Sequence, residues 1–163
     1  IGVRLVGSEM CIRDSFQSTQ NTSLDFTQLR AISAQSELEE PQIHRADELD
    51  YNWILECNSS EMKLMAALYE PHSQRHLRVF SDQPGLQVYS GNFLNGEAGK
   101  YQQTYSAHTG LCLETQHYPD SPNHPNFPST ILRKQDEFKS ATIYQFGVAQ
   151  PAMDAESNQP ILY

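Results

Sequence analysis

The sequence predicts an all-β fold, an antiparallel β-sandwich. Short apolar or alternating runs recur through the middle of the chain, and Asn, Ser, Pro or Gly clusters separate them. Alternation sends successive side chains to opposite faces of a strand, so one face can be covered while the other meets water. About seven such runs, with no amphipathic helical stretches between them, indicate a sandwich or barrel rather than alternating β and α units. In order, the runs are 52–55, 63–69, 76–80, 86–89, 110–115, 129–132 and 140–146.

The individual runs fit strands. Ala66 and Ala67 favour a helix in the second run, but the run is short and lies between an Asn-Ser-Ser cluster and Pro71, which favours a strand. The segments 76–80 and 141–146 alternate as antiparallel strands with one covered face do. Trp53, inside an Asn-Trp-Ile-Leu run, is expected in the core.

Composition excludes several classes of partner. The formal net charge is -9, and the 11 Lys and Arg residues are scattered. This argues against a nucleic-acid partner, because binding to the phosphate backbone is favoured by clustered cations. No apolar run approaches the roughly 18–20 residues of a membrane span. The three cysteines lack CxxC spacing, so neither a disulfide framework nor a structural zinc site is indicated. We therefore expect a reduced, cytoplasmic protein that binds neither nucleic acid nor membrane.

Three segments are expected along the chain. Residues 1–15 resemble a vector- or adaptor-derived leader and lack the features of a signal peptide, so we expect them outside the domain. The missing initiator Met fits a truncated reading frame. Residues 16–149 are expected to form one β domain, with a short extended piece at Thr22–Phe26 and one helical turn within 27–49. The polar residues 150–163 are expected to be disordered.

Glu114 is the first candidate for chemistry. Alternation across 111–116 places it on one face with Cys112 and Gln116, and places Leu111 and Leu113 on the other. If it is buried, the raised pKa of its carboxyl would suit a general base near neutral pH. If it lies on an edge strand facing water, no function is implied. This pattern alone leaves both alternatives open.

Three other patterns are weak. Gly96–Lys100 is not a phosphate-binding loop, because Leu94 stands where the first Gly belongs and Tyr101 follows the Lys; a hairpin is favoured. The spacing of His117, Asp120 and His124 would suit a metal only on a helix, which the interleaved prolines forbid. Nothing orients Cys112 and His108 as a thiol nucleophile and base, and a structural thiol is favoured.

Two long motifs carry a family resemblance. One runs from Val79 through Pro-Gly-Leu-Gln-Val-Tyr to Gly96, and the other runs from Gly110 through Cys-Leu-Glu-Thr-Gln to Pro128. Both resemble the C-terminal part of the aldose 1-epimerase (galactose mutarotase) family, and weaker similarity at Thr22–Phe26 and Asp50–Leu55 extends it. The resemblance implies a β-supersandwich of the galactose mutarotase type, incomplete in this chain.

The resemblance also implies an activity and its residues. The family interconverts the α and β anomers of free hexoses such as galactose or glucose without a cofactor or metal. The catalytic base corresponds to Glu114, and two sugar-binding residues correspond to Asp50 and Gln87. A monosaccharide is the implied partner, and a monomer is expected for the full-length protein. Carboxylate and amide groups suit this task because they hydrogen-bond to hydroxyls.

The chain departs from the family pattern in two ways. Tyr51 replaces the His that follows the Asp, and Glu48-Leu49 replaces the Gly-aromatic pair before it. The upstream motifs with the general-acid His, a second His and an Arg are absent from this sequence. We therefore expect the 163-residue chain alone to be nearly inactive. The alternatives are a non-catalytic sugar-binding protein of the same fold and a purely structural β domain.

Overall fold

A computed structural model describes residues 4–7, 16–32, 49–55 and 61–148. The strands are β1 (Arg4–Gly7), β2 (Gln17–Ser18), β3 (Asp50–Ile54), β4 (Lys63–Glu70), β5 (Arg75–Ser81), β6 (Gly85–Tyr89), β7 (Asn95–Ala98), β8 (Thr104–Ser106), β9 (Cys112–Gln116) and β10 (Thr142–Val148). Two short 3₁₀ helices, η2 (Lys100–Gln102) and η3 (Ser121–Asn123), interrupt the loops. No helix in these ranges has the length and apolarity that a membrane span requires.

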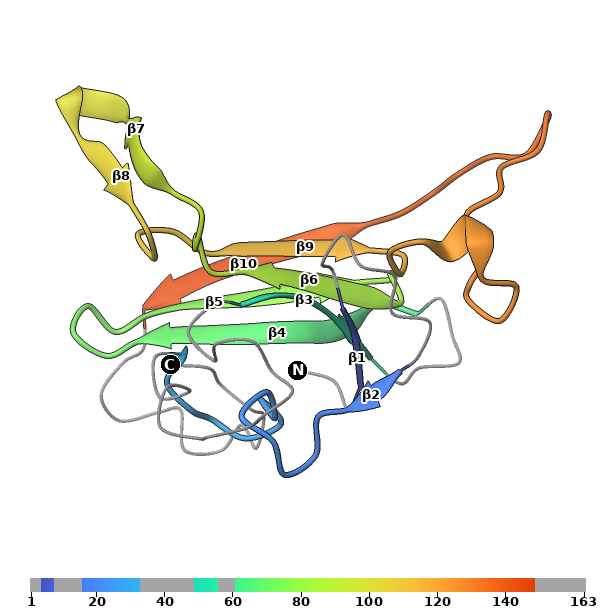
Figure 1. The fold of residues 1–163 in the computed structure, drawn as a ribbon, viewed down its shortest axis with the longest axis horizontal. Coiled ribbons are helices and arrows are strands. Elements are labelled where there is room, and N and C mark those ends of the chain that lie inside the picture. Colours follow the sequence, from blue (N-terminus) through green and yellow to red (C-terminus); the bar gives the residue numbers. More distant parts are fainter. Residues whose placement is uncertain (1–3, 8–15, 33–48, 56–60, 149–163) are drawn as a thin grey trace.

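The strands form two main sheets and one separate hairpin, all antiparallel. The larger sheet has the order β2-β1-β3-β6-β9, and the smaller has the order β10-β5-β4. Figure 1 shows β4, β5 and β10 running alongside the larger sheet. The expected antiparallel sandwich class is confirmed.

The core lies between the two sheets. From the larger sheet it takes the buried side chains of Trp53, Leu86, Val88 and Leu113, and from the smaller those of Met65, Ala66 and Val79. Trp53, expected in the core, has no exposed surface, and its Nε1–H donates to the Leu24 carbonyl oxygen at 3.3 Å. Leu24 and Phe26 complete this core, so residues 16–32 pack as part of the domain.

Polar contacts also join the two sheets. The Thr115 hydroxyl on β9 lies 2.5 Å from the Thr142 hydroxyl on β10, and the Ser81 hydroxyl on β5 lies 3.2 Å from that same Thr142 oxygen. The Tyr144 hydroxyl on β10 donates to the Leu113 carbonyl oxygen at 3.0 Å. These bonds connect the edge strand β9 to the smaller sheet.

Two segments project from the sandwich. The β7–β8 hairpin extends from one end, as Figure 1 shows, and the chain between β9 and β10 extends from the other. The residues of both strands of the hairpin are exposed. This hairpin is the structure expected for Gly96–Lys100, and the short 3₁₀ helix η2 lies in the turn between its two strands.

Several sequence-based expectations differ from the structure. Residues 129–132 are expected to form a strand but are irregular. They are exposed in the projecting segment between β9 and β10, where no described strand lies beside them to complete the backbone hydrogen bonds. Thr22–Phe26 forms turns rather than an extended piece, with Thr22 and Asp25 hydrogen bonds closing them. Residues 1–15 are expected outside the domain, yet Arg4–Gly7 pair with β3 as strand β1. The non-native origin of that segment stays a prediction. The expected disordered tail at 150–163 and most of the expected helical turn within 27–49 lie outside the described residues.

Candidate functional site

Three neighbouring strands bring the predicted site residues together. Residues directly opposite one another form a row across the larger sheet: Asn52 on β3, Gln87 on β6 and Glu114 on β9. Asp50 shares the face of Asn52 because side chains two apart on a strand point the same way. The opposite face carries Trp53, Val88 and Leu113 and covers the core. The row therefore lies on the polar face of the sheet, away from the core.

The predicted binding residues contact each other directly. Gln87 Nε2 donates to Asp50 Oδ1 at 2.7 Å. Gln87 is buried and Asp50 is half-buried, while Glu114 is exposed on the edge strand β9. The structure thus selects the water-facing alternative for Glu114, but with Gln87 immediately beside it. A carboxylate and an amide side by side can accept from and donate to the same hydroxyl group.

Aromatic side chains cover one end of this polar face. Ile54, which shares the face of Asn52 by alternation, packs against Phe127 and Tyr118 from the loop after β9. Phe16 adds a stacked contact to Phe127, with ring centroids 5.1 Å apart. Burial raises the pKa of the Tyr118 phenol above its usual value. The Pro/Asn-rich loop after Glu114 therefore folds back and bounds the site.

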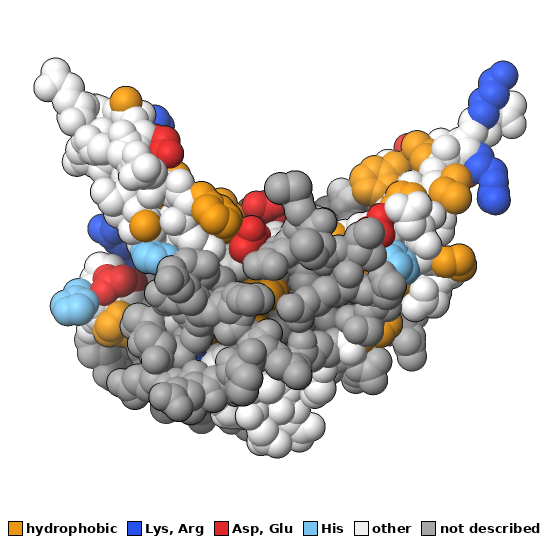
Figure 2. Space-filling view, viewed as in Figure 1, with side chains coloured by type: hydrophobic (Ala, Val, Ile, Leu, Met, Phe, Trp, Pro, Cys, Tyr) orange, Lys and Arg blue, Asp and Glu red, His pale blue; other side chains and the backbone are white. Residues whose placement is uncertain are grey.

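A second aromatic pair lies at the other end. Tyr89 is directly opposite Asp50 and Cys112, and its ring stacks on Phe93 at a centroid distance of 6.1 Å. The Phe93 backbone N–H donates to the Tyr89 hydroxyl oxygen at 2.9 Å. A few convergent polar groups between apolar walls are typical of small-molecule sites. Figure 2 shows acidic side chains at the surface in the hollow between the two projecting segments.

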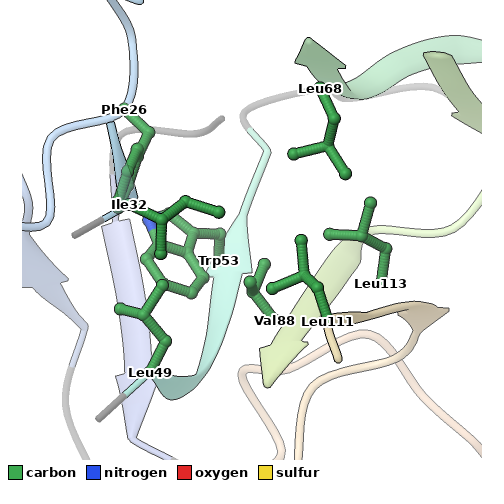
Figure 3. A pocket seen from close by; sticks show the side chains of 8 residues that line it. All are labelled: Phe26, Ile32, Leu49, Trp53, Leu68, Val88, Leu111 and Leu113. Atoms are coloured by element: carbon green, nitrogen blue, oxygen red, sulfur yellow. The ribbon is translucent and has the colours of Figure 1, made fainter. Parts of the chain in front are cut away.

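The apolar cavity in Figure 3 is a different feature. Eight hydrophobic side chains line it: Phe26, Ile32, Leu49, Trp53, Leu68, Val88, Leu111 and Leu113. It lies on the core face of the larger sheet, because Trp53, Val88 and Leu113 all point there. A hydrophobic lining offers no partner to sugar hydroxyls, so we place the candidate site on the polar face.

The weaker candidates do not assemble. His117 Nδ1 lies 2.8 Å from Gln83 Oε1, whereas His124 Nε2 lies 3.0 Å from Asp120 Oδ2. Their partners therefore differ, and no group of three potential metal ligands occurs within the described ranges. His108 Nδ1 contacts the Ser90 carbonyl oxygen at 3.2 Å rather than the exposed Cys112 thiol.

Comparison with known proteins shows the family of this chain. The family model described as Aldose 1-epimerase matches residues 3–145. The chain belongs to the aldose 1-epimerase family. A galactose mutarotase from Mus musculus is 46% identical over 101 residues, which cover 61% of this chain and 29% of that protein. An aldose 1-epimerase from Escherichia coli K12 is 33% identical over 135 residues, which cover 82% of this chain and 39% of that protein.

A solved structure shares the fold of this aldose 1-epimerase family member. The GalM/aldose epimerase homologue from C. elegans superimposes with a TM-score of 0.73 at 20% sequence identity. The alignment covers 91% of this chain and 44% of the homologue. The matched part therefore spans between 29% and 44% of the lengths of these proteins.

Three residues near the candidate site of this family member were not predicted from the sequence. Asn52 shares the face of Asp50 in the Asp-Tyr-Asn run, and Tyr89 shares the face of Gln87 in the Gln-Val-Tyr run. Strand alternation could have found both. Phe93 could not be found in this way, because its position depends on the chain turning back after β6 at Gly91, whose φ is +72°.

Proposed function

We propose that this chain carries the base-bearing part of an aldose 1-epimerase site that interconverts the α and β anomers of a free hexose. The observation that carries the proposal is the direct pairing of Gln87 with Glu114, together with the Gln87–Asp50 hydrogen bond. Three residues that match family motifs separately in the sequence are thereby adjacent on one face. The family membership supports the same activity.

The proposed chemistry follows from the residue types. Glu114 removes the proton from the anomeric hydroxyl, while an acid protonates the ring oxygen and the ring C–O bond breaks. The free carbonyl then presents its other face, and the reverse steps close the ring as the other anomer. Asp50 and Gln87 hold the sugar hydroxyls while the carbonyl group turns its other face to the ring hydroxyl. We propose no cofactor and no metal, and a monomeric, cytoplasmic full-length protein.

The chain by itself is proposed to be nearly inactive, because the general-acid motif of the family does not occur in its sequence. Loss of a general acid typically costs about 10²- to 10⁴-fold in rate. A suitable active form is a chimera in which this chain replaces the matching segment of the E. coli aldose 1-epimerase. That relative supplies the remaining length of the domain.

The test is mutarotation of freshly dissolved α-D-galactose and α-D-glucose, followed by polarimetry. The chimera is expected to exceed the spontaneous rate, and Glu114→Gln is expected to lower kcat by about 10²-fold or more. Glu137→Gln is the matched control, because that carboxylate is exposed and pairs with Lys139 at 3.0 Å. Equal rates for the two variants would contradict the assignment of the base. A chimera that binds hexose without accelerating mutarotation would support the sugar-binding alternative.

A further inference from the structure

Two opposite residues on the polar face have unpaired buried atoms. Asn52 has no exposed surface, and Gln87 is 8% exposed. In the described part of the chain, Asn52 Nδ2, Asn52 Oδ1 and Gln87 Oε1 have no hydrogen-bond partner. A buried polar group without a partner typically costs about 1–3 kcal/mol, so clusters of them call for a functional explanation.

The two side chains with unpaired atoms lie directly opposite each other. Asn52 and Gln87 are directly opposite on β3 and β6, where Cβ atoms lie about 4.5–5.5 Å apart. Asn52 Nδ2 is a donor and Gln87 Oε1 is an acceptor. The Asn52 amide lies over Gly85, where a Cβ atom would be 2.6 Å from Oδ1. The Asn52 amide thus occupies the space that a side chain at position 85 would fill, and a rotation away from Gly85 is needed to bring Nδ2 to Gln87 Oε1.

We propose that Asn52 is a positioning residue of the sugar site, whose side-chain amide rotates so that Nδ2 donates to Gln87 Oε1. The inference rests on the proposed function, because it assigns a role in the same site. Asn52 is buried and acts through Gln87, while Asp50, Gln87 and Glu114 are the groups that meet the sugar.

The hydrogen bond would fix which group Gln87 presents. One Nε2–H of Gln87 donates a hydrogen bond to Asp50 Oδ1, and Gln87 Oε1 would accept one from Asn52. The second Nε2–H then remains for a sugar oxygen, next to the Glu114 carboxylate. A hydroxyl that donates to Glu114 and accepts from Gln87 fits this pair. Asn52 thereby makes Gln87 a donor towards the hexose.

The test is an NMR measurement on the 163-residue chain without sugar. We expect slow exchange of the Asn52 side-chain amide protons and a scalar coupling across the hydrogen bond, from Asn52 ¹⁵Nδ2 to Gln87 ¹³Cδ. Asn52→Asp removes the donor and is expected to shift the Gln87 side-chain amide resonances. Gln145→Ala, an exposed change on β10, is expected to leave them in place. Absence of the coupling together with unmoved Gln87 resonances in Asn52→Asp would overturn the proposal.

A thermal double-mutant cycle gives an independent answer. The Tm decrease of the Asn52→Ala/Gln87→Ala double variant is expected to be smaller than the sum of the two single decreases, because each single variant leaves the other amide unpaired. Additive decreases, as expected for Asn52→Ala with Gln145→Ala, would contradict the hydrogen bond. Neither measurement involves sugar. The two proposals can therefore fail separately. If the chimera shows no mutarotation, the proposed function is refuted. If the NMR coupling is nevertheless present, the hydrogen bond between Asn52 and Gln87 is still supported.

Discussion

Phe26→Ala is a direct test of whether the segment before the first long strand belongs to the domain. Phe26 is 2% exposed and packs edge-on against Trp53, with ring centroids 5.9 Å apart and an interplanar angle of 73°. The Arg30 guanidinium lies 5.6 Å from the centre of the Phe26 ring. If residues 16–32 are part of the cooperative unit, removing this ring must weaken the whole sandwich.

The size of the effect follows from these contacts. A buried Phe replaced by Ala typically costs about 3–5 kcal/mol, and part of that is the lost aromatic pair of about 0.5–1.5 kcal/mol. Domains have a total stability of about 5–15 kcal/mol, so this loss is a large fraction of it. With a urea slope of about 2 kcal/mol per molar, a loss of 4 kcal/mol lowers the unfolding midpoint by about 2 M.

Trp53 is a suitable reporter, because it is the only Trp of the chain and is fully buried. Urea unfolding followed by its fluorescence compares wild type, Phe26→Ala and the control Phe138→Ala. Phe138 is 64% exposed, so its removal is expected to change the unfolding free energy by less than about 0.5 kcal/mol. Equal midpoints for the two variants would refute the reasoning and would mean that residues 16–32 do not stabilise the sandwich.

Two further changes test the turn after β4 and the junction of the sheets. Hydrogen bonds from the Ser73 hydroxyl and from the His72 and Ser73 backbone amides lower the pKa of Glu70 to about 2. Since folding depresses this pKa, the stabilisation is complete above pH 4.5 and is lost as the pH falls towards 2. Glu70→Gln should therefore flatten the pH dependence of Tm in that range. An unchanged dependence of Tm on pH would contradict this role of Glu70. Tyr144→Phe removes the bond to the Leu113 carbonyl and is expected to cost about 1 kcal/mol in urea unfolding, whereas an unchanged midpoint would show that the bond does not stabilise the junction.

The sequence predicts the strands well where alternation is strong. The runs at 63–69, 76–80 and 86–89 became β4, β5 and β6 with boundaries shifted by about one residue, because a period of two is a local property of the chain. The run at 129–132 resembles a strand in composition only. It remained irregular because a strand also needs a partner, and sequence composition does not show whether one is present.

The candidate site was predictable as residue types but not as an arrangement. Motif similarity singled out Asp50, Gln87 and Glu114. Their adjacency depends on the register of three strands, with Gln87 opposite Glu114 after an intervening hairpin. The unpaired amide of Asn52 depends on that register and on the space above Gly85, so only coordinates could reveal it.

The pairing of the last strand with β5 has a consequence for the order of folding. Thr142 meets Ser81 from 61 residues further along the chain, whereas β4 and β5 are joined by one tight turn. Contacts between residues distant in sequence close large loops and form slowly. The β4–β5 hairpin can therefore assemble early, while the smaller sheet is completed only after β10 has left the ribosome.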